Sequence, residues 1–174
     1  MELGRALGAR VIAAVSDEAK AQFCRDLGAD EVLVYPRAMD GAAQRAFSGA
    51  IKALATGGVD VVCDPVGGDY AEPALRSLGW EGRFLVVGFP AGIPKIPLNL
   101  PLLKNCQIVG VFWGAFVQRD PAHFAAHVQE LFGLYAQGRI RPRISARFPL
   151  DRAPEALRLI EAREATGKIV LTMG

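Results

Sequence analysis

LGARVIAAVSDEAK, residues 7–20, is the stretch of sequence that decides the fold. Its central part, Arg10–Val15, is short, apolar and rich in small and β-branched side chains, which predicts a strand. Ser16 is an expected helix N-cap for Asp17–Leu27, because serine caps the first turn well and acidic residues there favour the helix dipole. Gly28 is expected just past the end of this helix. The stretch therefore predicts a strand that runs directly into a helix.

The same alternation of strand and helix continues along most of the chain. We expect strands at Glu31–Tyr35, Val59–Cys63, Arg83–Gly88 and Gln107–Phe112, and helices at Gly41–Ala55, Ala71–Leu78 and Pro121–Gln137. Nearly all-apolar strands separated by helices are typical of a parallel sheet with both faces covered. The proline-rich segment Pro90–Pro101 is expected to be a loop.

The last part of the chain predicts a smaller unit of strand, helix and strand. These elements are expected at Arg143–Phe148, Ala153–Ala165 and Lys168–Met173. They need not join the main sheet. We therefore divide the chain into a domain of residues 1–142 and a C-terminal extension of residues 143–174.

The first strand of a dinucleotide-binding sheet has no counterpart in this sequence. In that fold, strand one runs into G-x-G-x-x-G, and the following helix receives a pyrophosphate at its amino end. Here Glu2–Leu7 reads as the end of a helix that leads into Arg10–Val15, so this strand is counted as the second. The predicted fold class is α/β, a Rossmann-like doubly wound parallel sheet lacking its first strand and Gly-rich loop.

Loss of a central strand has an energetic consequence. In the usual order 3-2-1-4-5-6, Arg10–Val15 and Val59–Cys63 would both lose their common neighbour. Each buried, unpaired backbone group costs about 1–3 kcal/mol, so several of them could exceed the stability of a whole domain, about 5–15 kcal/mol. We expect the gap to be closed by direct pairing, by a strand of another chain or by further polypeptide.

Composition narrows the possible partners. The 174 residues are 51% hydrophobic and 22% charged, with a formal net charge of +2 and no block of like charge. This pattern argues against a nucleic-acid or membrane-surface partner. No signal peptide or membrane-length apolar run is evident, so we expect a cytoplasmic protein. The three cysteines lie far apart and are expected to be structural.

Several motifs in a fixed order carry a family resemblance. They are Leu7–Ala13, Leu27–Val32, Asp64–Gly68, Val109–Gly114 and Ala165–Leu171. With them the chain resembles the zinc-independent NADPH:quinone oxidoreductases, which are zeta-crystallin-like members of the medium-chain dehydrogenase/reductase superfamily. The resemblance covers essentially the whole chain but only the C-terminal, nucleotide-binding part of the family.

The resemblance implies NADPH as cofactor and hydride transfer to a quinone or another conjugated carbonyl. It also implies that the family's GroES-like catalytic domain is absent here, and that the C-terminal extension would pack on that domain. We expect the chain by itself to lack turnover, and to bind NADPH weakly or not at all because the contacts of the Gly-rich loop with the pyrophosphate are absent. We expect the complete enzyme to be a homodimer acting on a small molecule.

The adenosine end of the cofactor is expected beside the Arg10–Val15 strand. Ser16 and Lys20 lie one helical turn apart and resemble the family's site for a 2′-phosphate, whereas Asp17 could accept a ribose hydroxyl and favour NAD. Tyr35 matches a family position near the same phosphate, as does Arg163 in the tail. Without the family resemblance, Ser16 would be interpreted as a helix cap and Tyr35 as an edge residue. Lys20 and Arg163 would be interpreted as surface charges.

The nicotinamide end is expected at the carboxyl ends of later strands, where open α/β sheets bind ligands. The candidates that the motifs place there are Val66, Gly67, Val87, Gly88, Phe89, Phe112 and Trp113. Glycine lets the backbone approach a ligand closely, although a simple turn or core aromatics would give the same pattern. No catalytic side chain is assigned, because the cofactor carries the hydride chemistry.

Other interpretations remain open from the sequence. The parent could be an enoyl-thioester reductase or a zinc alcohol dehydrogenase, and the chain could instead be a non-catalytic, self-associating module. A methyltransferase shares the fold class. His123 and His127 have the i, i+4 spacing of metal ligands on a helix, but no third ligand is evident nearby, so we assign no metal.

Overall fold

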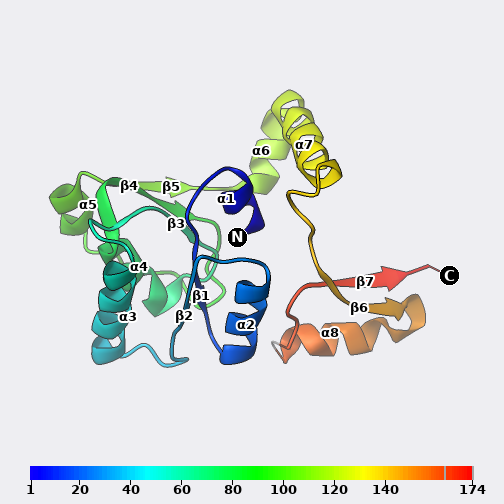
Figure 1. Cartoon of the computed structure of the whole chain (residues 1–174), viewed down its shortest axis with the longest axis horizontal. Coiled ribbons are helices and arrows are strands. Elements are labelled where there is room, and N and C mark those ends of the chain that lie inside the picture. Colours follow the sequence, from blue (N-terminus) through cyan, green and yellow to red (C-terminus); the bar gives the residue numbers. More distant parts are fainter. Residues whose placement is uncertain (163, 174) are drawn as a thin grey trace.

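The computed structural model describes residues 1–162 and 164–173 as an alternation of helices and parallel strands (Figure 1). In chain order the elements are α1 (Glu2–Ala6), β1 (Ile12–Val15), α2 (Glu18–Asp26), β2 (Glu31–Val34), α3 (Gly41–Leu54), β3 (Val59–Asp64), the 3₁₀ turn η1 (Gly68–Tyr70), α4 (Ala71–Arg76), β4 (Leu78–Val86), α5 (Asn99–Lys104), β5 (Gln107–Gly110), α6 (Trp113–Arg119), α7 (Pro121–Ala136), β6 (Ile144–Pro149), the 3₁₀ turn η2 (Leu150–Arg152), α8 (Ala153–Glu161) and β7 (Lys168–Thr172).

The strands form three parallel groups. β1 pairs with β2, from Ile12 opposite Glu31 to Val15 opposite Val34. β3, β4 and β5 pair in that order, and β6 pairs with β7 in a sheet of their own. The expected α/β class with parallel sheets is confirmed. Figure 1 shows β6, α8 and β7, in orange to red, as a group beside α2.

The edges of β1 and β3 do not pair with each other. Within the described residues β1 is hydrogen-bonded to β2 and β3 to β4, so the sheet is divided at the position expected for strand one. Direct pairing, one of the three expected ways of closing the gap, is therefore contradicted. Leu33 of β2 and Val59 of β3 both pack against buried residues of α3, so this crossover helix connects the two groups without backbone pairing between their strands. Closure by another polypeptide stays a prediction.

Helix α3 joins the two strand groups through a shared hydrophobic cluster. Its Phe47 and Ile51 are buried together with Met39. Leu33 on β2 and Val59 on β3 both pack against the same cluster. The helix begins where Asp40 accepts hydrogen bonds from two backbone N–H groups of its first turn. This cluster is what fixes the position of β2 relative to β3.

A second core lies under β4. Phe84 and Leu78 on this strand are almost fully buried, against Ala71 and Leu75 on α4 and Leu100 on α5. Burying a large apolar side chain contributes about 1.5–3 kcal/mol, so this cluster is the main packing contribution to the β3–β4–β5 group. No helix among the described residues is long and apolar enough to cross a membrane.

Four details differ from the sequence expectations. The N-cap of α2 is Asp17, not Ser16, because the Asp17 carboxylate accepts the backbone N–H of Lys20. The expected helix at Ala71–Leu78 ends at Arg76, and β4 begins at Leu78. Helix α5 begins inside the segment expected to be a loop, and α6 was not expected at all.

A fifth difference concerns the apolar strands. Val59–Cys63 and Gln107–Phe112 were expected to be buried on both faces. In the structure Val61 is 54% exposed, Phe112 is 79% exposed, and every residue of β5 is exposed. The helices of the described chain pack on part of the sheet only, which leaves these apolar side chains uncovered.

Candidate functional site

The predicted site residues gather where strands end. Ser16 directly follows β1, Tyr35 directly follows β2, and Val87 directly follows β4. Val66 and Gly67 come two and three residues after the last residue of β3, and Phe112 two residues after β5. Since paired parallel strands end at the same edge, each sheet presents its own candidates along one edge.

The turn between β1 and α2 holds three polar side chains in contact. The Lys20 ammonium donates to Ser16 Oγ at 3.1 Å and lies 3.2 Å from Asp17 Oδ2. Ser16 Oγ also donates to Asp17 Oδ2, at 3.1 Å. The two predicted phosphate ligands are therefore brought together, and Asp17 already neutralises the lysine.

The Asp17 carboxylate is stabilised in its charged form. The backbone N–H of Lys20 donates to Asp17 Oδ1 at 2.9 Å, and this bond is the main reason that the pKa of Asp17 lies below its ordinary value of 3.8. Partial loss of water acts in the opposite direction, while the side chains of Lys20 and Ser16 lower the pKa further. The turn therefore carries an ionised aspartate at neutral pH.

Tyr35 links the end of β1 to the turn that follows Gly67. Its backbone N–H donates to Val15 O, next to Ser16. Its ring packs edge-on against Phe47 and lies 4.8 Å from the ring of Tyr70, which belongs to the turn after Gly67. The Tyr70 hydroxyl donates to Arg37 O at 2.8 Å. The sequence analysis did not single out Tyr70, although its position two residues after the glycine pair was a usable signal.

The loops after β3 and β4 are tied together by their backbones. Ala91 N–H donates to Val66 O at 3.0 Å, and Gly68 N–H donates to Gly92 O at 2.7 Å. Gly67 has φ +70°, and a Cβ there would lie 2.6 Å from Phe89 Cβ. Only glycine fits this contact, so the predicted residues Val66, Gly67 and Phe89 form one packed unit.

The same two loops expose apolar side chains. Val87 is 44% exposed and Phe89 53% exposed, whereas Gly67 is buried. The backbone N–H of Gly88 lies 3.4 Å from Asp64 O, which continues the β3–β4 pairing. The result is a rigid backbone support with an apolar surface, which suits a flat, partly apolar ligand.

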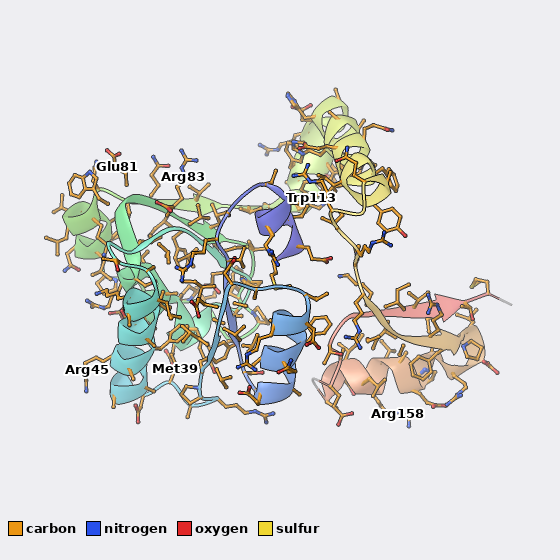
Figure 2. The ribbon with its side chains drawn as sticks, viewed as in Figure 1. Met39, Arg45, Glu81, Arg83, Trp113 and Arg158 are labelled. Atoms are coloured by element: carbon orange, nitrogen blue, oxygen red, sulfur yellow. The ribbon has the colours of Figure 1, made fainter. Side chains whose placement is uncertain are left out.

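The end of β5 leads into a cluster of aromatic rings. Val111 N–H donates to Val86 O at 2.9 Å, which places Phe112 beside the end of β4. Trp113, labelled in Figure 2, opens α6 and stacks with His127 of α7 at 6.3 Å between ring centres. Phe116 lies against both rings. Phe116 of α6 and His127 of α7 therefore fix the position of the Trp113 indole.

The two histidines of α7 have other partners than a metal. His123 Nδ1 lies 2.6 Å from Asp120 Oδ2, and His127 stacks on aromatic rings. Within the described chain no group of three or more His, Cys, Asp or Glu side chains is arranged to hold a metal ion. The predicted ligand Arg163 lies outside the described residues, so its role stays a prediction.

Comparison with known proteins gives a consistent picture. A family model for zinc-binding dehydrogenases matches residues 27–171. Quinone oxidoreductase-like protein 2 from Bos taurus is 38% identical over 168 residues, which are 96% of this chain and 46% of the relative. Acryloyl-coenzyme A reductase from Sulfurisphaera tokodaii is 27% identical over 173 residues, 98% of this chain and 46% of the relative.

Solved structures agree with the sequence relatives. A mycobacterial protein solved in complex with NADPH superposes with a TM-score of 0.84 and 30% identity, over 98% of this chain and 51% of that one. The chain thus spans just under half the length of the quinone oxidoreductase-like and acryloyl-coenzyme A reductase relatives.

Proposed function

Because the chain belongs to the zinc-binding dehydrogenase family, we propose that it is the nucleotide-binding part of an NADPH-dependent oxidoreductase. The proposed reaction is hydride transfer to a quinone or another conjugated carbonyl. The observation that carries this proposal is the division of the candidate site. One half is a polar turn with Ser16 and Lys20, and the other is an apolar surface over a glycine-containing backbone unit.

The polar turn suits the 2′-phosphate of NADPH. Ser16 Oγ and Lys20 Nζ are 3.1 Å apart, so one phosphate group can bind both. A phosphate dianion accepts several charge-assisted hydrogen bonds and would replace Asp17 as the partner of Lys20. Asp17 itself favours a ribose hydroxyl, as in NAD sites. We propose that Lys20 makes the site bind NADPH in preference to NADH. This agrees with the bound cofactor of the mycobacterial neighbour.

The apolar half suits the nicotinamide ring. Val87, Phe89, Phe112 and Trp113 present exposed apolar side chains at the ends of neighbouring strands. When bound, NADPH supplies the hydride from nicotinamide C4. The residues of this chain would orient the ring and keep water from one side of it. No described residue is needed as an acid or base for the hydride itself.

Binding of adenosine phosphates tests the proposal on the chain as it is. The 174-residue chain should bind 2′,5′-ADP at least fivefold more tightly than 5′-ADP in an NMR titration, with shifts centred on the Ser16, Asp17 and Lys20 amides. Lys20→Ala should remove the preference, whereas Lys52→Ala, on an exposed position of α3, should leave it intact. Equal affinity for both nucleotides in the unmodified chain would contradict the assignment.

A second acceptor class is supported by one comparison. The similarity to acryloyl-coenzyme A reductase extends over 98% of this chain, so an enoyl thioester is a specific alternative to a quinone. Hydride would then go to the carbon–carbon double bond conjugated with the thioester. NADPH oxidation measured with a benzoquinone and with a crotonyl thioester separates the two classes.

Turnover by the chain alone is expected to be very low. The printed sequence has no G-x-G-x-x-G loop for the pyrophosphate, so we propose that it binds NADPH weakly. Oxidation of NADPH at the rate of a complete reductase would contradict this. We also propose a homodimer, and sedimentation velocity tests it. Self-association without any nucleotide binding would instead support a non-catalytic module.

A further inference from the structure

One buried carboxylate has no role in the site described above. Asp64, the last residue of β3, is 7% exposed and is the one charged side chain that is buried within residues 1–162 and 164–173. A buried charge is costly unless it is paired or hydrogen-bonded. Asp64 has no role in the proposed hydride transfer, so its burial needs a different explanation.

Asp64 bonds to both loops of the apolar half. Its Oδ1 accepts the backbone N–H groups of Val66 at 2.9 Å and Gly67 at 3.0 Å. Its main-chain oxygen accepts the N–H groups of Val87 at 2.9 Å and Gly88 at 3.4 Å. One residue therefore contacts four of the positions that we assign to the nicotinamide end.

The Asp64 side chain bonds one loop, and its main-chain oxygen bonds the other. The bonds to Val87 and Gly88 come from the main chain and would survive any substitution. The bonds to Val66 and Gly67 come from one carboxylate oxygen, and ionised acceptors make the stronger hydrogen bonds. They hold Gly67 at φ +70°, the conformation in which it packs against Phe89. Without them only the backbone bonds between the two loops, from Ala91 N–H to Val66 O and from Gly68 N–H to Gly92 O, hold the first loop against the second.

We propose that Asp64 is a positioning residue that sets the spacing of the two loops that receive the nicotinamide half of the cofactor. It acts through backbone groups of Val66 and Gly67 and does not touch the cofactor. This inference rests on the proposed function, because that function assigns the ligand. The geometry of the loops themselves is independent of the ligand.

The first part of the test uses no ligand. Backbone amide exchange is measured by NMR in the full chain and in Asp64→Ala and Asp64→Asn. Alanine should speed exchange at least tenfold at Val66 and Gly67, and at Gly68 and Ala91, which bond the two loops together. Asparagine keeps a carbonyl oxygen in place of Oδ1 and should restore slow exchange. If alanine prevents folding, Asp64→Glu displaces the carboxylate by one methylene and serves the same purpose.

The second part compares the two halves of the cofactor. Asp64→Ala should weaken NADPH binding at least fivefold and leave 2′,5′-ADP binding unchanged, and Asp64→Asn should bind NADPH as the unmodified chain does. A general folding defect would weaken both nucleotides and would overturn the inference. Loss of NADPH binding in Asp64→Asn would indicate direct contact with the cofactor and would also overturn it.

The outcomes separate the inference from the function on which it rests. Unchanged amide exchange in Asp64→Ala contradicts the inference alone. Failure of the unmodified chain to bind either nucleotide contradicts the proposed function and, with it, the ligand that Asp64 is said to serve.

Discussion

The turn after β1 and the loops after β3 and β4 are built in different ways. The first consists of side chains: Ser16, Asp17 and Lys20 contact one another through exchangeable polar bonds near the surface. The second consists of backbone: the loops exchange N–H···O bonds around the buried Gly67. Polar contacts at a surface are weak and respond to salt and pH, whereas tight backbone packing does not. Ligand specificity can therefore be changed by single substitutions in the turn after β1, whereas the shape of the loops after β3 and β4 is fixed by their backbone.

The largest effect on stability is expected from a substitution at Gly67. A Cβ there would lie 2.6 Å from Phe89 Cβ and 2.8 Å from Gly92 O, at a positive φ. We expect Gly67→Ala to lower the free energy of unfolding by roughly 2–4 kcal/mol, because backbone strain and overpacking act together. Urea denaturation followed by circular dichroism measures the change.

Gly110 gives a matched control for the added methyl group. A Cβ at Gly110 meets nothing within 4 Å and needs no positive φ. Gly110→Ala should therefore stay within about 0.5 kcal/mol of the unmodified chain. A similar small effect at Gly67 would show that the loops after β3 and β4 are no more rigid than the turn after β1.

The next largest effect is expected at the aromatic cluster behind Phe112. Trp113 stacks with His127, so a double-mutant cycle of Trp113→Ala and His127→Ala should show a coupling free energy of about 0.5–1.5 kcal/mol. His123 pairs with Asp120 instead, and His123→Ala should not couple with Trp113. Equal coupling for both histidines would contradict the view that stacking supports this end of the site.

A smaller effect, on nucleotide affinity, is expected in the turn after β1. Asp17→Asn keeps a side-chain oxygen that can cap α2 but removes the charge that holds Lys20. We expect this variant to bind 2′,5′-ADP about two- to fivefold more tightly than the unmodified chain, at low salt. Isothermal titration at 20 and 300 mM salt measures it. The same gain with 5′-ADP would mean that the 2′-phosphate is not the group that Lys20 binds.

The smallest effect is the acid sensitivity of the same turn. The folded-state pKa of Asp17 is lowered, chiefly by the backbone N–H of Lys20, so the ionised form stabilises the fold. This contribution is complete above the unfolded value of 3.8 and is lost as pH falls through the lower folded value. The difference in urea midpoint between the chain and Asp17→Asn should therefore be constant from pH 5 to 7 and shrink below about pH 4. A difference that grows on acidification would contradict the assignment.

The sequence predicted most of the strands because their signal is local. Val59–Cys63 and Glu31–Tyr35 are apolar runs bounded by glycine or proline, and the structure has strands there that differ by one residue at the end. Helix α5 was missed because Pro101 lies inside it and the surrounding prolines favoured a loop. The cap of α2 was assigned to Ser16 because serine and aspartate are equally good caps, and only the bond to Lys20 N distinguishes them.

The sequence pointed to individual residues of the candidate site and not to the contacts between them. Glycine after a buried strand pointed to Val66 and Gly67, and the loops do pack there. The contact of Tyr35 with Tyr70 and the bonds of Asp64 to the loop after β3 were not predicted, although Asp64 and Tyr70 lie in or beside the glycine motif. Such contacts depend on the packing of α3 and η1, which periodicity does not encode.

By itself the sequence determined the α/β class, the parallel strands and the residues that follow them, because alternation of apolar strands and capped helices is a local property. Three features follow only from tertiary packing: β1 and β3 do not pair with each other within the described residues, Lys20 is already bound by Asp17, and Asp64 is buried between two loops. Each of these depends on which surfaces meet in space, and that is set by packing across the whole chain.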